Sequence, residues 1–278
     1  MSRGSEKFDP AAGHNGNPTL SKEHTHGSIV LTPEMFEKLY LSPKSSVKGD
    51  LRSILANPTP VGLLGLALAL TPLACNLMGW RGAGGTGAAS IGSYFFLGGF
   101  LMMLGGLLEF LLGNTYSFVN FCGYGGWWWT FGATLQPFFG AYAAYSPDPS
   151  TPRLGLENPE FNASFGFTLL FMGVFSFSCT LCSLTTNLAL FGIELFLTLT
   201  FTLLASSFFA SAEASPVAHN LQVAGGACAF VAAMCGWYLF FALMLASVNF
   251  PIQLPVGDLS HIFRFFRKNE VVEGESPV

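Results

Sequence analysis

Long apolar segments constrain the fold of this 278-residue chain more than any other feature of its sequence. A helix needs roughly 20 residues to cross a hydrocarbon layer of about 30 Å. Backbone groups in lipid require internal hydrogen bonds, and the alternating pattern of a membrane barrel is absent, so these segments predict helices. We therefore expect an all-α integral membrane protein with six transmembrane helices, at residues 58–78, 91–112, 121–145, 163–184, 187–209 and 223–248.

The rest of the chain divides into two tails around this domain. Residues 1–50 are polar and predict a largely disordered cytoplasmic tail, with a short amphipathic helix near residues 32–40. The six helices occupy residues 51–250, and residues 251–278 form a second cytoplasmic tail.

The position of the few charged residues predicts the orientation. Charged residues make up only 10% of the chain, against roughly 25% in soluble domains. Ten of the 12 Lys and Arg residues lie before residue 57 or after residue 258. An even number of spans puts both termini on one side, and this basic excess indicates the cytoplasm. The formal net charge of -4 argues against a nucleic-acid partner.

Motifs for metal binding and catalysis receive no support. Cys179 and Cys182 form a CxxC within an apolar segment, but no second CxxC or His pair stands nearby to complete four ligands. The apolar segments contain no phosphate-binding GxxxxGK[ST], no HExxH and no nucleophile–base pair. The sequence therefore predicts no catalytic residue, no metal and no cofactor.

The first span opens with a polar and Pro-rich segment, residues 57–63. Asn57 suits a helix cap and Pro58 the first helical position, so an ordinary helix start explains the pattern. The alternative is that the Asn57 side chain and the positive end of the helix dipole face a cavity where a carboxylate docks. Further along, Pro72 removes a backbone hydrogen bond and predicts a kink or local opening near Leu68.

Two acidic residues, Glu109 and Glu194, fall within the spans. An ionised side chain there is costly unless it is paired, hydrated or neutralised, and neither residue has an evident Lys or Arg partner within the membrane. Protonation, hydration or hydrogen bonding each permits a proton-linked role. The alternatives are contact with interfacial water for Glu109 and an interhelical hydrogen bond to Ser or Thr for Glu194.

These motifs resemble, in order and spacing, those of the acetate uptake transporter family, also called the GPR1/FUN34/YaaH family. The resemblance covers residues 50–260 and looks more fungal than bacterial. It rests on Asn57 to Leu63 (family NPAPLGL, with Thr59 for Ala and Val61 for Leu), Leu108-Glu109-Phe110 running to Gly113-Asn114-Thr115, Tyr124-Gly125-Gly126-Trp127-Trp128 (family YGxFW), and Leu254 to Asp258 (family PVGD).

The resemblance implies a homo-hexamer in the plasma membrane, in which each protomer carries its own path for acetate and other small carboxylates. It places a constriction at Leu66, Tyr124 and Leu197, where Leu66 departs from the usual Phe. It further implies a substrate-binding set formed by Asn57, Pro58, Thr59, Pro60, Gly62 and Leu63. Glu109 and Asn114 of its second-helix motif, together with the intramembrane acid Glu194, form the expected proton-linked or polar set.

The expected mechanism is proton-coupled uptake. The pKa of a small carboxylic acid is near those of Asp and Glu, so at mildly acidic pH it crosses an apolar constriction far more cheaply with a proton than alone. Uptake is then expected to rise as external pH falls, with acetate, protons and membrane lipid as partners. Three alternatives remain open: an acetate channel, an ammonia or ammonium exporter, and a non-transporting membrane regulator.

Overall fold

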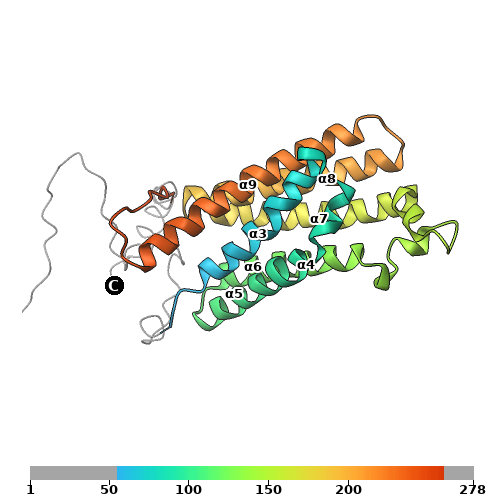
Figure 1. Ribbon diagram of the computed structural model, residues 1–278. Coiled ribbons are helices and arrows are strands. Elements are labelled where there is room, and N and C mark those ends of the chain that lie inside the picture. Colours follow the sequence, from blue (N-terminus) through green and yellow to red (C-terminus); the bar gives the residue numbers. More distant parts are fainter. Residues whose placement is uncertain (1–54, 260–278) are drawn as a thin grey trace, which may run out of the picture. The chain divides into compact units, whose positions relative to one another are not determined.

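The computed structural model describes residues 55–259, and its helices form a bundle (Figure 1). The predicted N-terminal tail with its short helix near residues 32–40, residues 260–278 of the predicted C-terminal tail, and the basic residues that flank the first and last spans lie outside the described residues. Within residues 55–259 the main helices are α3 (Thr59–Leu77), α4 (Ile91–Ser93), a π-helical turn (Tyr94–Gly99), α5 (Phe100–Leu111), α6 (Thr115–Leu135), α7 (Pro159–Ser183), α8 (Leu188–Ala212) and α9 (Ala218–Ser247).

Five helical segments of the described chain are long and apolar enough to cross a membrane. They are Thr59–Leu77, Gly85–Leu111, Pro159–Ser183, Leu188–Ala212 and Ala218–Ser247. The remaining long helix is α6, which has 21 residues and packs in the same bundle. The all-α class is confirmed, whereas α6 as a sixth span stays a prediction.

The predicted bounds of the third span, 121–145, are wrong at both ends. Helix α6 begins at Thr115, because the side chain of Asn114 caps it by accepting a hydrogen bond from the Ser117 backbone N–H. It ends at Leu135, and the chain turns at Pro137, whose missing N–H cannot continue a helix. Short 3₁₀ turns then lead to α7.

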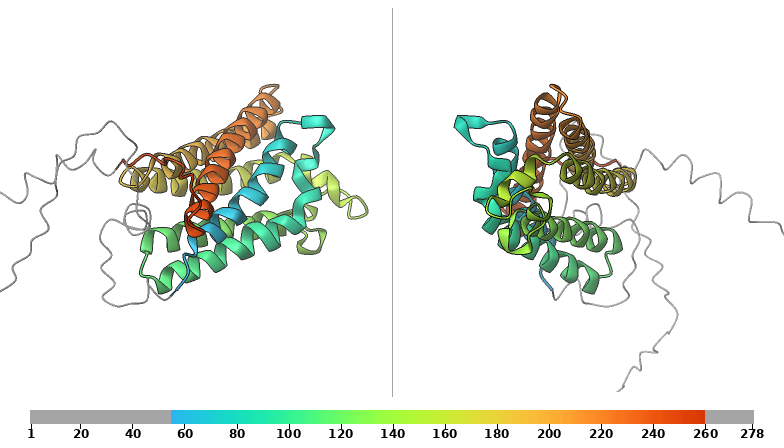
Figure 2. Two further views of the ribbon diagram at one scale, coloured as in Figure 1. Left: turned by 60° about the vertical axis from the view of Figure 1, so that its left-hand side comes forward. Right: turned by 90° about the vertical axis from the view of Figure 1, so that its right-hand side faces the viewer.

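The helices pack as a ring. Helix α7 packs on α8, α8 on α9, α9 on α3, α3 on α5 and α5 on α6, and α6 touches α7 lightly to complete the circuit. Figure 2 shows α3, in blue, between the green helices α5 and α6 and the orange helix α9. Large apolar side chains such as Phe96 and Phe171 remain exposed on the outside of the bundle, as a lipid-facing surface requires.

Pro72 lies within α3 without opening it, since the helix is continuous from Thr59 to Leu77. Because Pro72 has no N–H, the Leu68 carbonyl lacks its usual helical donor. The Ser93 hydroxyl donates to that oxygen at 3.3 Å instead. The π-helical turn begins immediately afterwards, at Tyr94. A side chain of the neighbouring helix therefore stabilises the carbonyl that Pro72 leaves without its donor.

The chain after α9 folds back onto the start of α8. The backbone N–H of Leu188 donates to the carbonyls of Val256 at 3.2 Å and Gly257 at 2.8 Å. Tyr238 donates its hydroxyl to the Pro255 carbonyl, and Val256 is buried. Residues 254–259 thus lie beside the start of α8 and Tyr238 of α9, at the end of the bundle where the first of the cavities described below is found.

Candidate functional site

Three cavities follow one another along helices α6, α8 and α9. Each of these three helices contributes residues to all three cavities in order along its length. Helix α3 lines two of the cavities, and α7 lines the third. We call them the Asn187 cavity, the central cavity and the vestibule. The Asn187 cavity lies where α3, α6 and α8 begin and α9 ends, and the vestibule lies at the opposite end.

The vestibule is the largest, with a volume of about 510 Å³. Its wall mixes aromatic side chains with polar ones, including Thr134, Glu157, Asn162, Ser207 and Gln222. The other two cavities have about 20 Å³ each, which by this measure is room for one water molecule. A solute in the vestibule therefore meets a narrow segment before it reaches the far end.

The central cavity is lined almost entirely by apolar side chains. Leu66 of α3, Tyr124 of α6 and Leu197 of α8 all line it, and each is buried. The structure thus brings together the three residues that the family resemblance places at the constriction. Trp127 and Phe201 also line this cavity, with their rings edge to face and centroids 5.2 Å apart.

The predicted substrate-binding set divides in two. Thr59 and Leu63 line the Asn187 cavity, whereas Asn57, Pro58, Pro60 and Gly62 line none of the three. The Asn57 side-chain oxygen accepts a hydrogen bond from the Thr59 backbone N–H at 3.0 Å, while the cap position of α3 is Pro58, one residue later than predicted. Asn57 therefore serves the start of α3.

Glu109 is fully buried, so the interpretation that it reaches interfacial water is wrong. It accepts hydrogen bonds from the Thr59 hydroxyl at 2.5 Å and the Asn114 side-chain amide at 2.9 Å. Asn114 also donates to the Ser117 hydroxyl oxygen at 2.9 Å. These bonds connect the start of α3, the end of α5 and the start of α6, beside the Asn187 cavity.

Glu194 of α8 makes interhelical hydrogen bonds, as predicted, but its partners are not Ser or Thr. The side-chain amide of Asn120 lies 2.6 Å from Oε1, and the Tyr124 hydroxyl lies 2.8 Å from Oε2. Tyr124 also lies 2.9 Å from the Ser176 hydroxyl of α7. Since Asn120 lines the Asn187 cavity and Tyr124 the central cavity, Glu194 lies behind the wall between the two.

Two polar residues of the path are missing from the predicted set. Of the buried side-chain nitrogen and oxygen atoms in residues 55–259, only Trp128 Nε1 and Asn187 Nδ2 have no hydrogen-bond partner. Trp128 lines the central cavity and Asn187 the first one. In the sequence, Asn187 resembles an ordinary helix cap and Trp128 an ordinary membrane aromatic, so neither gives a local signal.

Nowhere in the described range do three potential metal ligands of the His, Cys, Asp or Glu types come together.

Comparison with known proteins identifies the family to which this arrangement belongs. The GPR1/FUN34/YaaH family matches residues 41–261 of this chain. The chain belongs to this family. Residues 41–261 include every helix that lines the path, so family membership rests on the segment that forms the three cavities.

Individual relatives agree with this assignment. Protein alcS of Aspergillus fumigatus is 44% identical over 237 residues, covering 85% of this chain and 87% of its own length. Acetate transporter protein patA of Aspergillus clavatus is 35% identical over 216 residues, covering 77% and 83%. The structure of the bacterial acetate channel SatP is similar with a TM-score of 0.58 and 27% identity, over 73% of this chain and 99% of that one.

Proposed function

We propose that this chain transports acetate and related short carboxylates across the plasma membrane. The observation that carries the proposal is the line of three cavities along α3, α6, α8 and α9, narrowed by the apolar side chains of the central cavity. The names of the relatives, an acetate transporter protein and an acetate channel, supply the substrate class. A path of this kind supports a transporter rather than an enzyme.

The membrane arrangement is part of the same proposal. Six spans, with α6 as the third, put both termini in the cytoplasm, so the vestibule opens outside and the Asn187 cavity inside. The protomers assemble as a homo-hexamer through their apolar outer surfaces. Leu66, Tyr124 and Leu197 exclude hydrated ions at the central cavity, and the carboxylate enters from the vestibule.

We assign proton coupling to Glu194, because the contacts around its carboxyl group outnumber the hydroxyl protons of Tyr124 and Ser176, which supports a neutral carboxyl. Ser176 donates its one hydroxyl proton to the Met172 carbonyl at 2.9 Å, so Tyr124 is the donor in its contact with Ser176. Tyr124 has no second proton for Glu194. The three contacts, from Glu194 to Tyr124, from Tyr124 to Ser176 and from Ser176 to Met172, are hydrogen bonds at the same time only when Glu194 is protonated and supplies the third proton. The other titratable side chains near Glu194 are Tyr116 and Cys179.

We expect Glu194→Gln to flatten the pH dependence of acetate exchange. A glutamine is neutral at every pH and donates to Tyr124 as the protonated acid does, whereas ionised Glu194 repels the substrate anion. At pH 5 the variant and the natural chain should exchange acetate at nearly the same rate. At pH 8 the variant should be at least three times faster. The measurement is exchange of labelled acetate in liposomes with equal pH on both sides.

Glu160→Gln is the matched control, because Glu160 is an exposed acid in the first turn of α7 and lines none of the cavities. The ratio of its exchange rate to that of the natural chain should stay near 1 throughout. A ratio for Glu194→Gln that does not change with pH contradicts the proton-linked role.

The proposed function itself is tested by uptake of labelled acetate into liposomes that hold the purified chain, with and without an inward proton gradient. Accumulation that requires the gradient is the expected result. Equilibration of acetate whatever the gradient indicates a channel. Absence of acetate flux contradicts the proposal. If ammonium salts then dissipate a pH gradient across the liposome membrane, the chain forms an ammonia path. If neither acetate nor ammonia crosses, the chain is a membrane regulator.

A further inference from the structure

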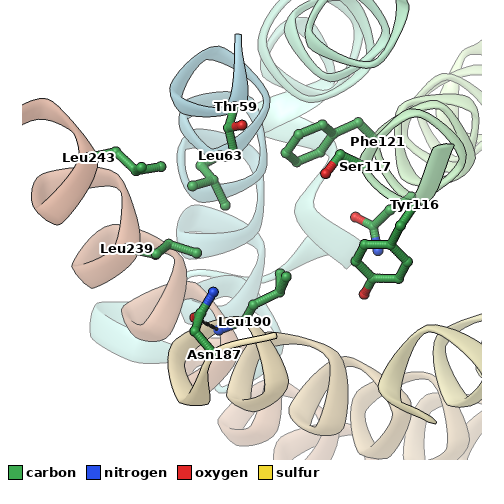
Figure 3. Close-up of a pocket in the computed structure, with 10 residues that line it drawn as sticks. Thr59, Leu63, Tyr116, Ser117, Phe121, Asn187, Leu190, Leu239 and Leu243 are labelled. Carbon is green, nitrogen blue, oxygen red and sulfur yellow. Dashed lines mark hydrogen bonds between the residues drawn. The ribbon is translucent and has the colours of Figure 1, made fainter. Parts of the chain in front are cut away.

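The side chain of Asn187 caps α8 with one atom and leaves the other facing a cavity. Its Oδ1 accepts a hydrogen bond from the Leu190 backbone N–H at 2.8 Å, which fixes which end of the amide is nitrogen. Figure 3 shows the nitrogen pointing into the space between Leu239 and Leu190. Asn187 is 1% exposed, and Nδ2 has no partner within the described chain. A buried donor without an acceptor is costly, which favours a ligand there.

Several of the neighbouring donors are already used. The Thr59 hydroxyl donates to Glu109, the Tyr116 hydroxyl to the Cys179 carbonyl at 3.2 Å, and the Asn120 amide to Glu194. At the start of α8, the backbone N–H groups of Leu188 and Leu190 are bonded as well. Among the side chains that line this cavity, the Asn187 amide nitrogen has no acceptor, and the Ser117 hydroxyl accepts from Asn114 and keeps its own proton for a ligand.

The charge and shape of this cavity select a particular class of ligand. The N-terminus of the 25-residue helix α8 carries a partial positive charge, which attracts an anion. The rest of the wall is apolar, formed by Leu63, Phe121, Leu239 and Leu243 among others. It suits a short alkyl group and leaves no partner for a second charged group. The volume of about 20 Å³ means that leucine side chains rotate when the ligand enters.

We propose that Asn187 binds the carboxylate of short monocarboxylic acids through Nδ2, with Ser117 as a second donor and the alkyl group against the leucines. This inference rests on the proposed transport function and refines it. It moves the anion site from Asn57, whose side-chain oxygen is bonded to the Thr59 N–H, to the start of α8. The site lies at the end of the path opposite the vestibule.

The test uses two substitutions that keep the helix cap. Asn187→Asp still accepts from Leu190 but replaces the donor by an anionic oxygen, and Asn187→Ser removes the amide. We expect KM for labelled acetate exchange in liposomes to rise at least tenfold in Asn187→Asp and at least threefold in Asn187→Ser. An unchanged KM in Asn187→Asp overturns the proposal. If Asn187→Asp does not fold, Asn187→Ser decides in the same way.

Asn158→Ser is the matched control. Asn158 caps α7 by accepting from Glu160 N at 2.8 Å, but its amide nitrogen already donates to the Tyr145 carbonyl at 2.9 Å. Its KM should stay within twofold of the natural chain. Competition adds a check on ligand class: propionate should inhibit acetate exchange at least tenfold more strongly than succinate, and equal inhibition contradicts the apolar placement of the alkyl group.

Binding of ¹³C-acetate to the detergent-solubilised chain, followed by NMR line broadening, separates this inference from the proposed function. Broadening that is present in the natural chain and lost in Asn187→Asp supports the site even if liposomes show no acetate flux, which would contradict transport alone. Flux and broadening that are both unaffected by the substitution contradict the site and leave transport standing.

Discussion

Gly105→Val is expected to prevent the chain from folding. Helices α3 and α5 approach so closely that a Cβ on Gly105 would lie 2.9 Å from the backbone nitrogen of Gly62 and 3.1 Å from its Cα. Both neighbours are backbone atoms, so no side-chain rotation relieves the overlap. Overpacking typically costs about 1–3 kcal/mol and occasionally more, and the upper end is expected here because backbone atoms cannot move aside by rotation. The helices would separate, which also breaks the bond between Thr59 and Glu109 one turn away.

The measurement for this variant is the yield of monodisperse protein in detergent and its thermal unfolding midpoint. Gly126→Val is the matched control, because a Cβ on Gly126 in α6 meets nothing within 4 Å. It should unfold close to the natural chain. A folded Gly105→Val protein with an unchanged midpoint would show that the α3 and α5 contact does not limit stability.

Leu197→Ala is expected to widen the path and raise acetate flux at least fivefold. Leu197 is 2% exposed and lines the central cavity opposite Leu66 and Tyr124. Its removal costs about 2–5 kcal/mol of stability and leaves a void, which enlarges a cavity that now has about 20 Å³. Benzoate, which has a carboxylate on a bulky ring, should then enter liposomes that exclude it when they hold the natural chain.

Leu199→Ala provides the control on the same helix. Leu199 is 42% exposed and lines no cavity, so its loss should change neither the rate of acetate exchange nor the exclusion of benzoate. Flux is compared per amount of folded protein, determined by size-exclusion chromatography. An unchanged acetate rate in folded Leu197→Ala protein contradicts the assignment of the constriction to the central cavity.

The helices themselves were largely predictable from the sequence. The span predicted at 91–112 agrees with the helical run Ile91–Leu111, and that predicted at 58–78 agrees with α3. The exception is α6, whose Gly and Trp residues blur the hydropathy pattern. Its start is set by the Asn114 cap and its end by Pro137, two local signals that hydropathy does not weigh.

The candidate site was only partly predictable. The family motif led to Leu66, Tyr124 and Leu197, which the structure places around one cavity. The same motif pointed to Asn57, and the structure instead bonds its side-chain oxygen to the α3 backbone. Asn187 gave no signal, because a helix cap has the same local sequence whether its amide nitrogen is bonded or not.

The sequence by itself determined the fold class and the helical segments, because apolar length and internal backbone hydrogen bonding are properties of contiguous residues. Only the tertiary structure decided which polar groups meet. Glu194 is 74 residues from Asn120 and 70 from Tyr124, and all three come together because α6 and α8 line the same path. Whether a buried amide finds an acceptor depends on where the neighbouring helices place their oxygens, and this left Asn187 Nδ2 facing a cavity.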